Sequence, residues 1–363
     1  MWPDSRLLDL LGIELPIIQA PMAGPVFSEM VVAVAEAGGL GSLPCATMGI
    51  DQLRSEFAAV RRGTAKPVNV NFFCHAPPTF DPDREAAWRE RLRPYYVEFG
   101  LDPDAPVPRS NRTPFDEEAC ALVEELRTEV VSFHFGLPEQ RLVDRVRATG
   151  AVVLSSATTV AEARWLEDHG CDAVIAQGVE AGGHRGMFLT DDIATQLGTF
   201  ALVPQVVDAV RIPVIAAGGI ADARGIVAAF VLGAAAVQIG TAYLFTREAR
   251  IAAPHGEALR SERARETALT NVFTGRPARG ILNRVMREVG PMTDLAPAFP
   301  LAGGALAPLR AATEGTGSGD FMSLWSGQSA ALCHETTAGE LTKRLASEAL
   351  ALLEHGISKA RRV

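Results

Sequence analysis

Apolar residues gather in short, nearly continuous runs that recur along the first two thirds of the chain. Most of these runs are followed by a turn signal and then by apolar residues at helical spacing. Consecutive apolar positions are typical of parallel strands that are covered on both faces. Eight such runs are predicted to be strands, at residues 16–22, 40–44, 67–73, 130–136, 151–156, 172–178, 213–219 and 235–241.

The alternation of these runs with helical segments predicts the fold class. Residues 28–39 and 51–62, for example, have the pattern of helices between strands. Strands that alternate with helices predict a parallel α/β sheet. Eight units favour a closed (β/α)8 TIM barrel over an open doubly wound sheet, and no GxGxxG motif follows a strand as a Rossmann unit would require. We therefore predict a barrel over residues 1–247.

Two stretches interrupt the alternation. Residues 75–115 are rich in Pro, Arg and Asp and are predicted to form an excursion after the third strand. Residues 248–335 follow the eighth strand and contain helical pieces, so we predict a helical cap that contacts the substrate. Residues 336–363 are expected to pack on the barrel as a C-terminal helix, whose amphipathic pattern runs over 338–360.

Charge and composition narrow the class of protein. The net charge is −9 and no basic run is long enough to follow a phosphate backbone, which argues against nucleic acid as a partner. The longest apolar runs contain glycine and divide into a helix and a strand, so no membrane span is predicted. Five cysteines without CxxC spacing, and no signal-peptide pattern, indicate a cytoplasmic protein without a disulfide framework or a zinc site. These features are compatible with a monomer or an oligomer.

The ends of the last two predicted strands carry a glycine pattern typical of phosphate binding. Gly218 and Gly219 follow the seventh strand, and Gly240 and Thr241 follow the eighth. In a barrel these neighbouring loops are the usual phosphate cradle, where exposed N–H groups meet an anion. Glycine allows the phosphate to approach the backbone, although tight turns also favour glycine. The pattern predicts a phosphate site.

Amide and imidazole side chains end other strands. Asn71 and Gln177 offer a donor and an acceptor each, which suits the pyrimidine edge of a flavin, but either could cap a loop instead. His184 lies in QGVEAGGHRG (177–186), which we interpret as a loop without regular structure that brings an imidazole close to a ligand. His134 ends the fourth strand, either as a buried histidine satisfied by a neighbour or as a substrate contact. Both histidines are candidate catalytic residues.

Several segments together resemble one family. In chain order they resemble the FMN-dependent nitronate monooxygenases, formerly called 2-nitropropane dioxygenases. Two later segments, TGRPARG (274–280) and LWSGQ (324–328), are similar to the class I branch of that family. The barrel segments that carry the resemblance are QAPM, NVNFF, SFHFG, QGVEAGGHRG, IPVIAAGGIAD and AVQIGTAYL.

The resemblance implies a cofactor, a reaction and the residues for both. It implies that His184 is the active-site histidine, and that an alkyl nitronate such as propionate 3-nitronate gives an electron to the flavin and reacts with O2 to form a carbonyl compound and nitrite. Enoyl-acyl-carrier-protein reductases and quinone reductases that use FMN share similar glycine segments, so an NAD(P)H-dependent FMN reductase remains the alternative. The implied FMN contacts are Gly219, Gln238, Ile239, Gly240 and Thr241 for the phosphate, and Met22, Asn71, Gln177 and Gly182 for the ring.

One further segment and one further residue each have two interpretations. Residues 326–328, Ser-Gly-Gln, either close over the flavin or form a solvent-exposed turn. Arg185 either attracts a substrate carboxylate or is a solvated loop arginine.

Overall fold

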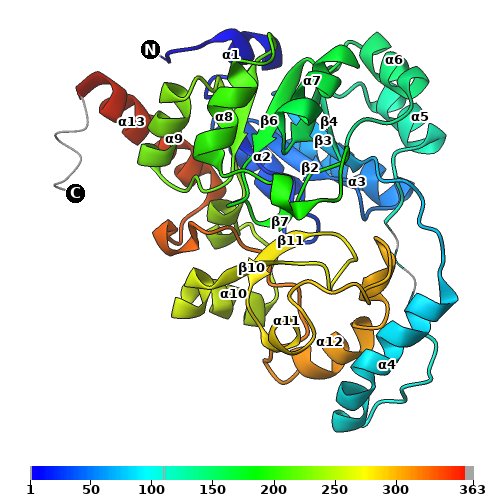
Figure 1. The fold of residues 1–363 in the computed structure, drawn as a ribbon. Coiled ribbons are helices and arrows are strands. Elements are labelled where there is room, and N and C mark those ends of the chain that lie inside the picture. Colours follow the sequence, from blue (N-terminus) through cyan, green and yellow to red (C-terminus); the bar gives the residue numbers. More distant parts are fainter. Residues whose placement is uncertain (1, 109, 111, 356–363) are drawn as a thin grey trace.

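Eight parallel strands form a closed barrel, as the sequence predicts (Figure 1). The computed structural model describes residues 2–108, 110 and 112–355. In sheet order β1 and β2 are the end strands, and Gln19 N donates to Leu40 O at 3.0 Å and Leu40 N to Ile17 O at 2.9 Å, which closes the barrel between them. Each predicted run overlaps one barrel strand, and β5 continues one residue past its run. The strands are β1 (Ile17–Gln19), β2 (Gly41–Pro44), β3 (Val68–Phe73), β4 (Val130–His134), β5 (Val152–Ala157), β6 (Ala173–Gln177), β8 (Val214–Ala217) and β9 (Ala236–Ile239).

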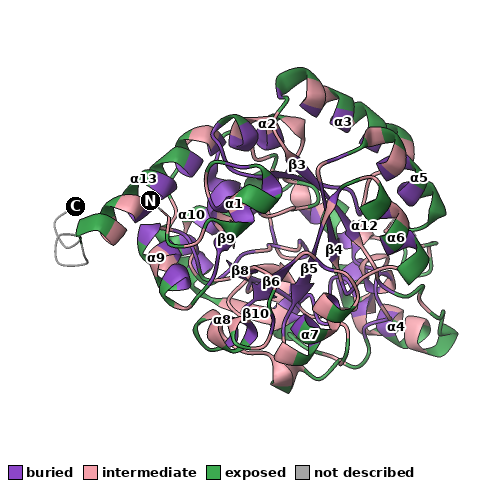
Figure 2. Ribbon diagram, turned by 90° about the horizontal axis from the view of Figure 1, so that it is seen from above, coloured by how far each residue is buried: buried purple, intermediate pink, exposed green. Residues whose placement is uncertain are grey.

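Helices surround the barrel (Figure 2). Several begin at a side chain that accepts hydrogen bonds from the first turn; Asp222, for example, accepts from the N–H groups of Arg224 and Gly225. The C-terminal helix α13 packs against α2 and α9, and the predicted helical residues 356–360 lie outside the described residues. The surrounding helices are α2 (Ser28–Glu36), α3 (Ile50–Gly63), α5 (Glu117–Leu126), α6 (Gln140–Ala148), α7 (Val160–Asp168), α8 (Thr199–Val207), α9 (Ala223–Val231) and α13 (Ala338–His355), with the short 3-10 turns η1 (Ile193–Thr195) and η2 (Thr241–Phe245).

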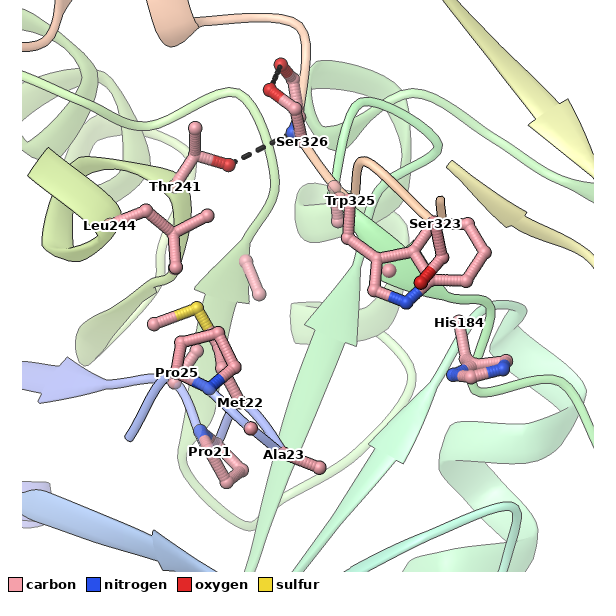
Figure 3. A pocket seen from close by; sticks show the side chains of 18 of the residues that line it. Pro21, Met22, Ala23, Pro25, His184, Thr241, Leu244, Ser323, Trp325 and Ser326 are labelled. Atoms are coloured by element: carbon pink, nitrogen blue, oxygen red, sulfur yellow. Dashed lines mark hydrogen bonds between the residues drawn. The ribbon is translucent and has the colours of Figure 1, made fainter. Parts of the chain in front are cut away.

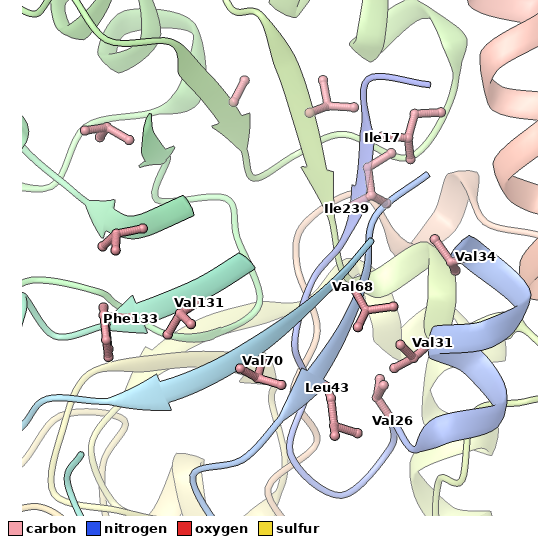
Figure 4. Close-up of a cluster of buried hydrophobic side chains, with 14 of the residues drawn as sticks. Ile17, Val26, Val31, Val34, Leu43, Val68, Val70, Val131, Phe133 and Ile239 are labelled. Carbon is pink, nitrogen blue, oxygen red and sulfur yellow. The ribbon is translucent and has the colours of Figure 1, made fainter. Parts of the chain in front are cut away.

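Side chains along each barrel strand alternate between the helices and the barrel interior. On β3, Val68 and Val70 belong to the apolar cluster between strands and helices (Figure 4), whereas Asn71 and Phe73 line the cavity described below. This is the two-residue period of a strand. The same period turns the side chain of Ile239 outward, where it is buried in the helix-facing cluster.

A helix seals the N-terminal end of the barrel. Leu7 and Leu11 of α1 (Arg6–Leu11) share an apolar cluster with interior residues of the strands, among them Ile18, Leu154 and Ile215. The interior therefore opens only toward the C-terminal ends of the strands, where a barrel carries its active site.

The segment after β9 is not purely helical, and in this respect the prediction was incomplete. It holds two strands, and the second pairs antiparallel with β7 (Gly183–His184) in the loop after β6, with Ala278 opposite His184. The expectation that His184 has no regular structure was therefore wrong, because a remote strand supplies its pairing partner. The elements of the segment are α10 (Ala253–Arg260), η3 (Glu262–Arg265), β10 (Thr267–Thr270), β11 (Ala278–Ile281), α11 (Arg284–Glu288), η4 (Leu301–Gly303), α12 (Ala307–Glu314) and η5 (Ala330–Leu332).

The excursion after β3 packs against this segment (Figure 1). It contains α4 (Pro82–Glu98), whose Trp88 and Tyr96 share an apolar cluster with Leu309 and Phe321. Trp88 Nε1 also donates to the carbonyl of Ala302 at 3.0 Å. The two segments together form one body beside the barrel mouth, which we call the cap. Among the described residues, no helix is both long and apolar enough to cross a membrane.

A substitution at Gly41 tests how tightly helix α2 packs on strand β2 of the barrel. A Cβ at Gly41 would lie 2.8 Å from Val31 Cα and closer still to the Val31 carbonyl oxygen, so α2 and β2 touch through their backbones. We expect Gly41→Ala to lower the free energy of unfolding by about 2–4 kcal/mol, because neither backbone can retreat. Gly315→Ala is the control, since a Cβ there meets nothing within 4 Å. Equal urea midpoints for the two variants would contradict this packing.

Candidate active site

A cavity of about 730 Å³ lies between the barrel mouth and the cap. Figure 3 shows Pro21 and Met22 on one side of it, Trp325 and Ser326 of the cap opposite, and His184 at one end. All the predicted site residues line it except Ile239, whose side chain points to the helices. Those that line it are Met22, Asn71, His134, Gln177, Gly182, His184, Gly218, Gly219, Gln238, Gly240 and Thr241.

The two glycine loops meet at one end of the cavity. Gly218 and Gly219 have φ of 108° and 72°, which glycine adopts without strain. Among the described residues, nothing accepts a hydrogen bond from the N–H groups of Gly219 or Gly240. Both glycines line the cavity, with Gly219 exposed and Gly240 half-buried, so their N–H groups are open to a ligand there and suit an anion. The Oε1 atom of Gln238, which also lines the cavity, is buried and has no hydrogen-bond partner in the described part of the chain.

Gln177 is engaged in holding the histidine segment. Its Oε1 accepts from Gly186 N at 2.8 Å, and its Nε2 donates to the His184 carbonyl at 2.9 Å. Both ends of its amide therefore have protein partners, which fits the loop-capping interpretation. Asn71 differs, because its Nδ2 donates to Ser132 while its side-chain oxygen Oδ1 makes no hydrogen bond among the described residues.

His184 sits among aromatic rings. The ring centroids of Phe73, Phe299 and Trp325 lie 6.1, 5.4 and 5.6 Å from its own. Its Nε2 is 3.0 Å from the hydroxyl oxygen of Thr274 in the cap. Burial, and then the nearby cations, lower the pKa of His184 well below 6.5. The imidazole is therefore neutral at pH 7.

His134 lines the cavity, but both of its ring nitrogens have partners. Its Nε2 is 3.3 Å from the carbonyl oxygen of His184, and its Nδ1 is 2.9 Å from the hydroxyl of Ser156. A carbonyl only accepts, so Nε2 carries the proton and Nδ1 accepts from the serine. Burial lowers the pKa of His134 to about 3, which keeps the ring neutral. This geometry fits the interpretation of a buried histidine satisfied by its neighbours.

Two arginines near His184 have different roles: Arg185 holds the backbone, and Arg112 lines the cavity. Arg185 is fully buried and donates to the carbonyls of Gln177 and Gly178, so it neither is solvated nor reaches the cavity. Arg112, from the excursion, lines the cavity instead. Burial lowers the pKa of Arg112, and no described carboxylate offsets this effect. Glu314, the one lining carboxylate among the described residues, is paired with Arg310 at 3.3 Å.

Sequence reasoning missed several residues around His184. Arg112, Phe299, Trp325 and Thr274 all come from the cap, and Phe73 ends the third predicted strand. Phe73 could have been found, because it follows Asn71 by two positions and so faces inward. Thr274 and Trp325 lie in TGRPARG and LWSGQ, which the resemblance marks without giving these two residues a role, and nothing local singles out Arg112 or Phe299.

The segment 326–328 closes one wall of the cavity. Gly327 N donates to Thr241 Oγ1 at 2.9 Å (Figure 3), and Gln328 N to Glu180 O at 3.0 Å. Ser326 and Gly327 are buried and only Gln328 is exposed, so a solvent-exposed turn is wrong for the first two residues.

Comparisons with known proteins agree with one another. A family model described as nitronate monooxygenase matches residues 4–348. A nitronate monooxygenase of Pseudomonas aeruginosa is 44% identical over 348 residues, which cover 95% of this chain and 99% of that protein. The crystal structure of a nitroalkane oxidase from Streptomyces ansochromogenes superposes with a TM-score of 0.87 at 38% identity, covering 96% of this chain and 99% of that chain. FabK from Thermotoga maritima gives a TM-score of 0.70 at 28% identity, with 96% and 97% covered.

The family match spans nearly the whole chain, so it includes both the barrel and the cap of this protein. Together with the cavity around His184, this identifies the chain as an enzyme of the nitronate monooxygenase family.

Proposed function

We propose that this protein binds FMN and oxidises alkyl nitronates, such as propionate 3-nitronate, with O2 to a carbonyl compound and nitrite. The observation that carries the proposal is a single cavity with an anion cradle at the barrel loops and a neutral His184 near the half-buried cation of Arg112. The family and its relatives support nitronate as the substrate class.

The residues present fit FMN. The unpaired N–H groups of Gly219 and Gly240 suit its phosphate. The unpaired oxygen of Gln238 is an acceptor for an N–H or O–H group of a ligand. When bound, FMN supplies the electron acceptor that protein side chains lack.

The chain's own residues suit an anionic substrate. Arg112 offers positive charge, and burial strengthens its attraction for an anion. The neutral ring of His184 offers an N–H donor, and Phe73 and Phe299 keep water from the space around it. Charge, donor and apolar wall together favour a nitronate over a neutral or cationic ligand.

Anaerobic mixing separates this function from an NAD(P)H-dependent FMN reductase. We expect propionate 3-nitronate to bleach the flavin absorbance rapidly, and NADH or NADPH to bleach it slowly or not at all. In air, nitrite should form with the nitronate. Rapid bleaching by a pyridine nucleotide, with none by the nitronate, would overturn the proposal.

Replacing His184 tests its role in the reaction. We expect His184→Gln to lower kcat/KM for nitrite formation by about 100-fold, the usual contribution of a positioned imidazole. The flavin content should not change. His334→Gln is the control, because His334 is exposed and lies outside the cavity. Near-normal activity in His184→Gln would rule out a catalytic role.

Gly240→Ala tests the phosphate cradle separately from the fold. A Cβ at Gly240 would make ordinary contacts, 3.5 Å from Ala20 Cβ and 3.7 Å from Met22 Sδ, so the apoprotein should unfold at the same temperature. The added methyl would hold a phosphate away from the backbone N–H, and we expect Kd for FMN to rise by about tenfold. Fluorescence titration measures this, with Gly315→Ala as the control. An unchanged Kd would place the phosphate elsewhere.

A further inference from the structure

The TGRPARG motif (274–280) wraps the chain segment that carries His184. It forms the turn between β10 and β11 and the start of β11. Five of the seven residues of the motif contact residues between 179 and 187, which the proposed function does not explain. The contacts are Thr274 Oγ1 with His184 Nε2, Arg276 with Met187 O, Pro277 O with Arg185 N, Ala278 paired with His184, and Arg279 with Val179 O.

Thr274 is held rigidly where it meets the histidine. It is 4% exposed. The next residue, Gly275, has φ of 90°, and a Cβ there would lie 2.7 Å from Phe299 N and closer still to the Pro297 carbonyl oxygen. The backbone that follows Thr274 is therefore tightly packed, which restricts movement of the hydroxyl away from the imidazole.

The ring of His184 depends on this hydroxyl for its orientation. Gln177 and His134 hold the backbone carbonyl of His184 but not its ring. The surrounding aromatic rings contact it without a hydrogen bond. Among the described residues, Thr274 is the sole hydrogen-bond partner of the imidazole.

We propose that Thr274 is a positioning residue, whose hydroxyl donates to Nε2 of His184 and so leaves the proton on Nδ1, which makes no hydrogen bond among the described residues. The Thr274 oxygen lies 3.0 Å from Nε2 but 3.4 Å from the alternative acceptor, Arg276 O, so the shorter contact takes the hydroxyl proton. His184 then has a fixed N–H donor toward an anionic ligand. This role rests on the proposed function.

A tautomer is defined only while the imidazole is neutral. Burial favours the neutral ring, and the positive charges of Arg112 and Arg276 favour it further. His134 and His75 also lie near His184, but burial lowers the pKa of His134 to about 3 and that of His75 to about 4, so neither is charged at pH 7.5. Substituting Thr274 changes none of these groups, so it tests the hydrogen bond alone.

The test compares Thr274→Val, which keeps the branched shape, with Thr274→Ser, which keeps the hydroxyl. Side-chain 15N spectra of histidine-labelled holoprotein and apoprotein at pH 7.5 report the tautomer, and His184→Gln assigns the signal. We expect the Nδ1–H form in the wild type and the serine variant, and a mixture in the valine variant. Thr270→Val is the control, because Thr270 is a buried threonine of the same hairpin that does not contact His184.

The kinetic expectation follows from the same contact. In Thr274→Val, kcat/KM for the nitronate should fall by about tenfold, and in Thr274→Ser it should stay within about threefold. An Nε2–H tautomer in the wild type, or identical His184 spectra in the wild type and the valine variant, would overturn the inference. The spectra require no turnover, so a protein that orders His184 through Thr274 but releases no nitrite would contradict the proposed function alone.

Discussion

Closure of the parallel sheet between β1 and β2 is the constraint on which the rest of the molecule depends. All barrel strands are parallel, so a closed ring brings their C-terminal ends to one mouth. Helix α1 seals the opposite end with apolar side chains. Every inward-facing polar residue near the strand ends is therefore directed to the same space, however far apart these residues lie in the sequence.

The cap completes the cavity at the barrel mouth and surrounds His184. Its hairpin adds a strand to β7, so the backbone of His184 belongs to the barrel and the cap at once. The cap also supplies the cation, the hydroxyl and two of the aromatic rings around the imidazole, those of Phe299 and Trp325. Burial lowers the pKa of His134 and His184, so both rings are neutral. Burial also lowers the pKa of Arg112, and no described carboxylate beside it offsets this effect.

The sequence was sufficient for the barrel and for the residues that its strands direct to the mouth. Apolar runs locate strands because both faces of a parallel strand are buried. The implied contact of Ile239 overlooked the alternation that turns this side chain toward the helices. The pairing of His184 with Ala278, and the approach of Arg112 and Phe299, could not be predicted, because they join segments far apart in the chain and leave no local periodicity.

The wall formed by residues 326–328 has a consequence for the modularity of the enzyme. A Cβ at Gly182 would lie 2.5 Å from Gly327 N, and one at Gly327 would lie 2.9 Å from Glu180 O. Barrel and cap thus meet backbone to backbone, through a glycine on each side. A cap grafted from a relative would fit this barrel only if it had glycine at the position of Gly327. Changes in the cap and in the barrel at this junction must therefore occur together.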